Sequence, residues 1–190
     1  MLIDKLNWTK IGGQWFALLG VANLIGYGAS LLMSKDQYYY HFTYSTYPAR
    51  MFKPIKSMIG SDNLMNVIWT APSLIFLSIY MNKKVGALTM TKFFGLSLLS
   101  MWMFYSAFNP ESGFNVRPLR PYFPKFDAFA DDGSYYMGAD QMCQSLIYFT
   151  LLYHRLWVVA LPCMAFDLLY YGPATLGGPS SALVGALMFF

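Results

Sequence analysis

The sequence predicts an all-α polytopic membrane protein, and two observations carry this prediction. The first is composition: 56% of the 190 residues are apolar and only 12% are charged, whereas soluble domains carry about 25% charged residues. The second is the length of the uncharged runs, such as Trp15 to Met33 and Leu64 to Met81. A bilayer core is about 30 Å thick and takes roughly 20 apolar helical residues to cross. Several such runs in one short chain would leave a soluble fold without polar surface to cover them.

Six apolar segments are expected to form membrane-spanning helices, near residues 14–33, 64–81, 90–108, 140–154, 156–171 and 174–190. A short polar turn, Asn82 to Gly86, joins the second and third segments, which makes those helices antiparallel neighbours. The fourth and fifth segments are divided at His154-Arg155, because a charge at the bilayer centre is costly. These two segments are short, so four or five spans remain alternatives.

The charged and metal-ligating residues exclude other classes. The 13 Lys+Arg and 9 Asp+Glu give a formal net charge of +4, too small and too scattered for a nucleic-acid-binding face. Cys143 and Cys163 lie in apolar surroundings, without a C-x-x-C spacing or a histidine at ligand spacing, and His41 and His154 cannot build a metal site either. We therefore expect no metal site, no cofactor and no nucleic-acid partner.

Two long loops separate the predicted helices, at residues 34–62 and 109–137. The first is rich in tyrosine, a residue that sits well at the headgroup level of a membrane. Its cations Arg50, Lys53 and Lys56 predict a site for an anionic lipid headgroup such as cardiolipin; the alternative is the aromatic belt common to membrane proteins. Repeated prolines prevent a continuous helix in the second loop, and its length favours a binding or contact role over mere linkage.

Two carboxylates lie in or beside apolar segments. Asp140 stands at a predicted helix start, where a carboxylate interacts favourably with free backbone amides and the helix dipole. Asp167 has two interpretations: a proton-relay or ion-site carboxylate, or a helix end at the interface beside Tyr170 and Tyr171.

The last apolar segment carries a face of small residues, a pattern that lets helix backbones approach closely in lipid. Its members are Gly172, Gly177, Gly178, Ala182, Gly185 and Ala186. This face packs either inside the protein or against a partner. Pro179 predicts a kink or an interruption of the same helix.

Several short motifs follow one another along the chain: Arg50 with Phe52, Leu64 to Thr70, Asn82 to Gly86, Gly138 to Asp140, and Ala174 to Gly178. In this order they resemble the first-loop Trp-Arg motif, the second-helix Leu-x-His-x-x-x-Asn pattern, the Glu-Arg/Lys-x-x-Gly turn, the Gly-x-Ser-Gly site and the Ala-His-x-x-Gly motif of the rhomboid family. That family comprises six-helix intramembrane serine proteases and their inactive relatives. The resemblance implies a rhomboid-like bundle of about six helices.

The same resemblance implies a protein without the family's chemistry, which needs a serine nucleophile, a histidine base and oxyanion donors. The motifs place other residues at these positions: Asp140 for the serine, Thr175 for the base, and Asn66 and Thr70 for the second-helix His and Asn. Ser180 and Ser181 offer another hydroxyl, but no histidine follows His154 in the sequence. We therefore expect a pseudoprotease with no catalytic residues.

These observations favour a structural function. The expected protein is an accessory subunit of a multi-subunit membrane complex, with other membrane subunits and lipids as partners. The preferred setting is a respiratory-chain or ATP synthase assembly in the mitochondrial inner membrane. Two alternatives remain: a Derlin-like client-handling factor of the endoplasmic reticulum, and an unconventional rhomboid protease that uses Ser180 or Asp140.

Overall fold

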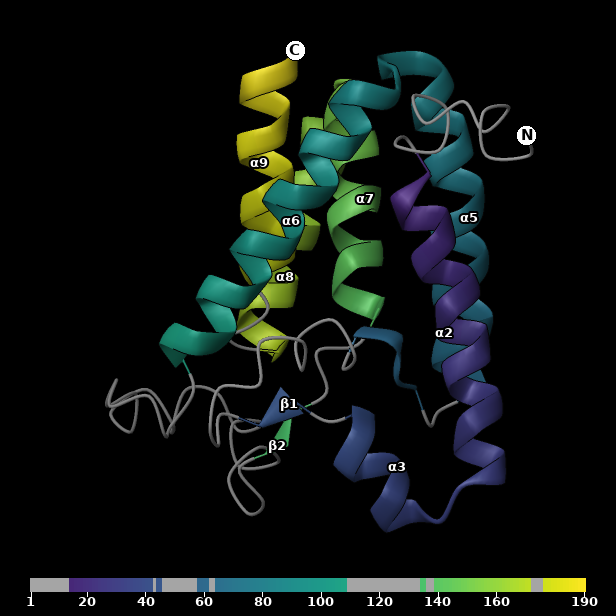
Figure 1. The fold of residues 1–190 in the computed structure, drawn as a ribbon. Coiled ribbons are helices and arrows are strands. Elements are labelled where there is room, and N and C mark those ends of the chain that lie inside the picture. The colour runs from purple at the N-terminus through teal and green to yellow at the C-terminus, as the bar shows by residue number, and fades with distance from the viewer. Residues whose placement is uncertain are drawn as a thin grey trace, which may run out of the picture.

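The computed structural model describes residues 14–42, 44–45, 58–61, 64–108, 134–135, 139–171 and 176–190 (Figure 1). Its helices are α2 (Trp15–Leu32), α3 (Lys35–Phe42), α5 (Leu64–Val85), α6 (Ala87–Phe108), α7 (Ala139–Tyr153), α8 (Trp157–Tyr171) and α9 (Gly177–Phe189). The strands β1 (Tyr44–Ser45) and β2 (Ser134–Tyr135) pair antiparallel, with Tyr44 opposite Tyr135 and Ser45 opposite Ser134. The described chain is thus helical, as predicted, apart from this two-residue ladder.

Helix lengths divide the bundle into two groups. By length and composition, α2, α5 and the Ala87–Phe104 part of α6 are each apolar enough to cross a membrane. Helices α7 and α8 have 15 residues each and α9 has 13, which is roughly 20 Å at 1.5 Å per residue. The lengths alone therefore identify three membrane-spanning candidates, where the sequence predicted about six.

Helix α7 occupies the middle of the bundle. It contacts α5 on one side and α9 on the other, and α2 packs along α5 (Figure 1). The chain reverses between α5 and α6 at Gly86, whose φ of 88° is a left-handed conformation that glycine adopts without steric cost. The two helices touch, and α9 packs against α6 as well as against α7.

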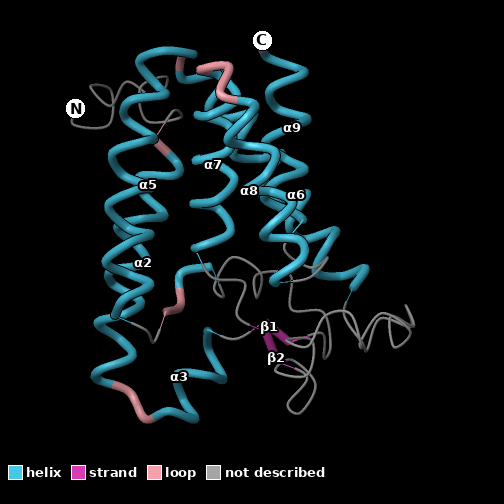
Figure 2. Tube along the Cα trace, turned by 180° about the vertical axis from the view of Figure 1, so that it is seen from behind, coloured by secondary structure: helices cyan, strands magenta, loops and turns pink. Residues whose placement is uncertain are grey.

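The chain also turns at His154–Arg155, where the sequence predicted a break. The amide of Arg155 donates to the carbonyl of Leu152, and that of Leu156 donates to the carbonyl of Leu151. With Arg155 at φ 58°, this pattern is a Schellman motif, which satisfies the last free carbonyls of α7. Figure 2 shows this turn and the Gly86 turn at the same end of the bundle.

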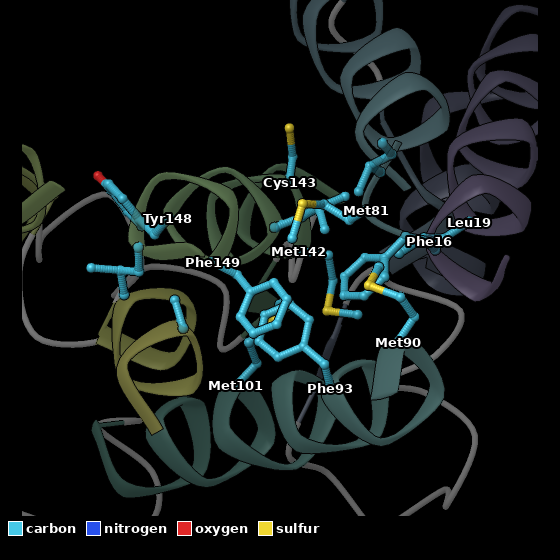
Figure 3. Close-up of a cluster of buried hydrophobic side chains, with 14 of the residues drawn as sticks. Phe16, Leu19, Met81, Met90, Phe93, Met101, Met142, Cys143, Tyr148 and Phe149 are labelled. Carbon is cyan, nitrogen blue, oxygen red and sulfur yellow. The ribbon is translucent and has the colours of Figure 1, made fainter. Parts of the chain in front are cut away.

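The interior is filled by aromatic and methionine side chains from α2, α5, α6 and α7 (Figure 3). The Phe93 ring stacks on Phe149 with centroids 3.9 Å apart and on Phe16 with centroids 5.6 Å apart. All three rings are fully buried, as are Met90 and Met142. This stacking joins α2, α6 and α7 into one core.

The segment expected to be a loop at residues 34–62 is partly helical, which corrects that expectation. Ser34 starts α3, because its hydroxyl accepts the amide of Gln37 and its carbonyl accepts the amide of Tyr38. Tyr38 is buried and its ring lies 4.8 Å from that of Phe42. This tyrosine therefore packs in the protein instead of lying at a membrane surface. Residues 109–133, most of the second predicted loop, lie outside the described part.

Candidate functional site

The side chains predicted to bind a lipid headgroup, Arg50, Lys53 and Lys56, lie outside the described residues. So does Thr175, which the motif resemblance aligned with the histidine base of the rhomboid family. Gly172 of the small-residue face also lies outside the described residues, as do Phe52, Gly138 and Ala174 of the motifs. The other candidate residues are described.

Three buried serines from three helices form one hydrogen-bonded chain. The hydroxyl of Ser181 on α9 donates to the carbonyl of Gly178 at 2.7 Å, and its oxygen lies 2.7 Å from that of Ser145 on α7. The Ser145 oxygen lies 2.8 Å from that of Ser97 on α6. A hydroxyl has a single hydrogen, so Ser145 donates to Ser181 and Ser97 donates to Ser145. The proton of Ser181 thus points at a backbone carbonyl, which is a very weak base.

The imidazole of His154 lies at the end of α7, away from this serine chain. Its Nε2 is 2.8 Å from the Tyr80 hydroxyl on α5, and the two rings are stacked with centroids 5.8 Å apart. His154 comes nine positions after Ser145, just past the end of α7, which is about 13 Å at the helical rise. In this arrangement His154 does not reach the Ser181 hydroxyl.

Asn66 and Thr70, which the motif resemblance aligned with the second-helix His and Asn, lie where α5 is linked to α2. The Thr70 hydroxyl lies 2.7 Å from the carbonyl oxygen of Asn66 and 3.3 Å from Oδ1 of Asn23. Asn23 is buried, and its Nδ2 donates to the carbonyl of Ile59 at 3.3 Å. Ile59 also packs so closely on Gly26 that a methyl group there would collide with its carbonyl. These polar groups therefore fix the backbone at residue 59 against α2.

The two carboxylates occupy different settings. Asp140 lies in the first turn of α7, as the sequence predicted for a carboxylate that favours a helix N-terminus. Asp167 on α8 accepts a hydrogen bond from the hydroxyl of Tyr148, a buried residue of α7. On α8, Ala160 and Met164 are buried, while most of the other side chains are exposed. The hydrogen bond between Tyr148 and Asp167 therefore adds a polar contact to a small apolar contact between α8 and the bundle.

The small-residue face of α9 points into the protein. A methyl group on Gly177 would lie 2.7 Å from the Cα of Met101, and one on Gly185 would lie 2.7 Å from Cδ2 of Phe93. Ala182 and Ala186 are buried on the same face. This settles the alternative left by the sequence in favour of internal packing against α6 and α7.

The predicted kink at Pro179 is wrong, because Pro179 is the third residue of α9, where its missing amide hydrogen would have no helical partner.

The cysteines and the other possible metal ligands among the described residues do not lie together at one site. Cys143 is a buried free thiol and Cys163 an exposed one. Within the described ranges, no group of three or more His, Cys, Asp or Glu side chains is placed to hold a metal ion.

Sequence reasoning missed the main polar contacts of the bundle. It did not single out Ser97, Ser145 or Tyr80, and only polarity inside an apolar segment could have drawn attention to them.

Comparison of the chain with protein-family models, with curated proteins and with solved structures finds no match. The rhomboid resemblance therefore stays a hypothesis based on the motifs.

Proposed function

We propose that this chain is an integral membrane protein with a structural, non-catalytic role, and that it acts as an accessory subunit of a multi-subunit membrane complex. The observation that carries the proposal is that the Ser181 hydroxyl pairs with the carbonyl of Gly178 and the hydroxyl of Ser145, neither of which is an effective base. A serine nucleophile needs a base that takes its proton, whereas the proton of Ser181 goes to the carbonyl of Gly178. Its neighbour Ser145 is itself a donor to Ser181. These hydroxyls serve to hold α6, α7 and α9 together.

The outer surface supports membrane insertion. Large apolar side chains face outward along the bundle, including Ile25 and Leu31 on α2, Trp69 and Phe76 on α5, and Val158 on α8. Exposed apolar surface of this extent is unfavourable in water and neutral in lipid. The apolar lengths of α2, α5 and α6 agree with this setting.

The assignment to a complex rests on the motif resemblance and on the lack of a nucleophile and base at the motif positions. A rhomboid-like bundle without that chemistry retains its shape and its apolar surface, which are what a packing subunit needs. The mitochondrial inner membrane is the setting that we prefer on the same grounds.

Native gel electrophoresis of the tagged protein after mild detergent extraction tests the subunit role. We expect migration far above 21.6 kDa, with membrane proteins as constant companions. Migration alone, near the mass of one chain, would remove the subunit proposal.

The non-catalytic part is tested separately with a fluorophosphonate probe on the purified protein, with Ser181→Ala and Ser180→Ala as matched controls. Labelling of the wild-type chain that either substitution abolishes would overturn it.

A further inference from the structure

The basic residues of helices α5 to α8 gather at one end of the bundle, and long stretches of these helices have no acidic residue. The sequence has no acidic residue from Asn63 to Pro110 and none from Gln141 to Phe166. The basic residues of these stretches are Lys83, Lys84, Lys92, His154 and Arg155, of which the three lysines and Arg155 carry a formal positive charge. Four of the five lie at or beside the two turns that Figure 2 places at one end.

Tyr80 brings the two turns together. Its hydroxyl contacts Nε2 of His154 at 2.8 Å, and Nζ of Lys84 lies 5.8 Å from the centre of its ring. Arg155 follows His154 directly, in the left-handed position of the Schellman motif. Lys84 and His154 therefore both lie against one tyrosine ring although 70 positions separate them in the sequence. We call Lys83, Lys84, His154 and Arg155, with Tyr80 between them, the basic turn surface.

Among the described residues, the formal charges at this surface are positive. The C-terminus of α5 carries a partial negative charge, and so does that of α7. Each is followed at once by the N-terminus of the next helix, α6 or α8, whose partial positive charge opposes it. The partial charges of the helix ends therefore largely cancel, while the formal charges of Lys83, Lys84 and Arg155 do not. These three side chains are exposed.

The depth of the surface matches the headgroup region. Helix α5 has 22 residues, about 33 Å, which is close to the thickness of the hydrocarbon core. A helix that enters at Leu64 therefore brings Lys83 and Lys84 out at the opposite surface. The partly exposed ring of Tyr80 lies beside Lys84, and Trp157, whose ring is also partly exposed, begins α8 two residues after Arg155, as is typical of an interfacial belt.

We infer that the basic turn surface binds the phosphate of an anionic lipid headgroup. The Arg155 guanidinium offers a planar pair of donors to phosphate oxygens and Lys84 supplies a point charge. Tyr80 is a positioning residue, which holds the two turns at a fixed spacing. This inference rests on the proposed membrane insertion but not on the subunit role, and it is independent of the site predicted at Arg50, Lys53 and Lys56.

Native mass spectrometry of the purified full chain in mild detergent tests the inference. The probes are dioleoyl-phosphatidylglycerol, dioleoyl-phosphatidylcholine and inorganic phosphate. The wild-type chain should prefer phosphatidylglycerol to phosphatidylcholine. Each cation at a membrane surface contributes about fivefold to binding, so Lys84→Gln with Arg155→Asn should weaken phosphatidylglycerol binding about thirtyfold. Asparagine is chosen at 155 because it tolerates the left-handed backbone.

Two control variants separate charge from folding. Lys35→Gln removes one charge from α3, at the other end of the bundle (Figure 1), and should leave binding within about twofold of wild type. Lys84→Arg with Arg155→Lys keeps both charges and should restore most of the binding. Equal phosphatidylglycerol affinity in the wild type and the neutralised variant would overturn the inference. Displacement of the lipid by millimolar inorganic phosphate would also overturn it, because a soluble phosphate would then be the ligand. Neither result depends on whether the protein belongs to a complex.

Discussion

Gly185 in α9 offers the sharpest test of the bundle, because a single added methyl group would enter a closed space. An alanine Cβ there would lie 2.7 Å from Cδ2 and 3.0 Å from Cε2 of Phe93, and 3.3 Å from Cδ2 of Phe149. The Phe93 ring cannot move aside, since it is stacked between Phe149 and Phe16. The Gly185→Ala change therefore forces α9 outward or the rings apart.

The expected magnitude follows from two opposing effects. Replacing a mid-helix glycine by alanine stabilises a helix by about 0.5–1 kcal/mol. Overpacking a filled core costs about 1–3 kcal/mol. The balance for Gly185→Ala spans about 0–2.5 kcal/mol and is centred near a destabilisation of about 1 kcal/mol, which corresponds to a melting temperature about 2–4 °C lower for a chain of this size.

Gly95 in α6 is the matched control. It is exposed, and nothing lies within 4 Å of a Cβ built on it, so Gly95→Ala should keep only the stabilising effect of about 0.5–1 kcal/mol. Both variants are compared by thermal unfolding in mild detergent, followed by near-ultraviolet circular dichroism and by the monomer peak in size-exclusion chromatography. A rise in melting temperature for both variants would refute the packing of α9 against Phe93.

Three further predictions concern other contacts of the bundle. Ser145→Ala removes the middle of the serine chain and leaves the buried hydroxyl of Ser97 without this partner. The free energy of unfolding should therefore fall by about 1–2 kcal/mol. An unchanged melting temperature would show that the three serines contribute no stability. At the two turns, Gly86→Ala should destabilise by about 1–2 kcal/mol through its positive φ alone, since no atom lies near its Cβ, whereas Arg155→Gly should stabilise by about 1 kcal/mol for the same reason; melting shifts of equal sign would contradict the turn geometry. Tyr148→Phe and Asp167→Asn should be coupled in a double-mutant cycle by about 0.5–2 kcal/mol, and additive effects on unfolding would mean that this pair does not hold α8 to α7.

The sequence predicted where the helices form, because that information is local. Uncharged runs long enough for a bilayer predicted α2, α5 and α6. The turn predicted over Asn82 to Gly86 is shorter in the structure, because Asn82 to Val85 form the last turn of α5 and only Gly86 lies between the two helices. The cost of burying a charge placed a break at His154-Arg155, where the chain turns. The start of α3 was missed, since Ser34 was read as part of a tyrosine-rich loop and its capping hydroxyl was overlooked.

The side on which each helix packs could not be read in the same way. In water, an apolar face must point inward and a polar face outward. In lipid both directions are apolar: Leu74 is fully buried while Phe76, two residues along the same helix, is 71% exposed. The pattern of apolar residues therefore carries little information on facing, and the small-residue face of α9 was open to two interpretations.

The amino-acid sequence by itself determined that this chain is helical and apolar and where the three longest apolar helices run, because hydropathy and turn chemistry act over neighbouring residues. Only the tertiary structure decided that Gly185 packs on Phe93, that Ser97, Ser145 and Ser181 form one chain, and that Tyr80 joins the two turns. Each of these contacts links residues more than 35 positions apart, and their partners are fixed by how whole helices fit together.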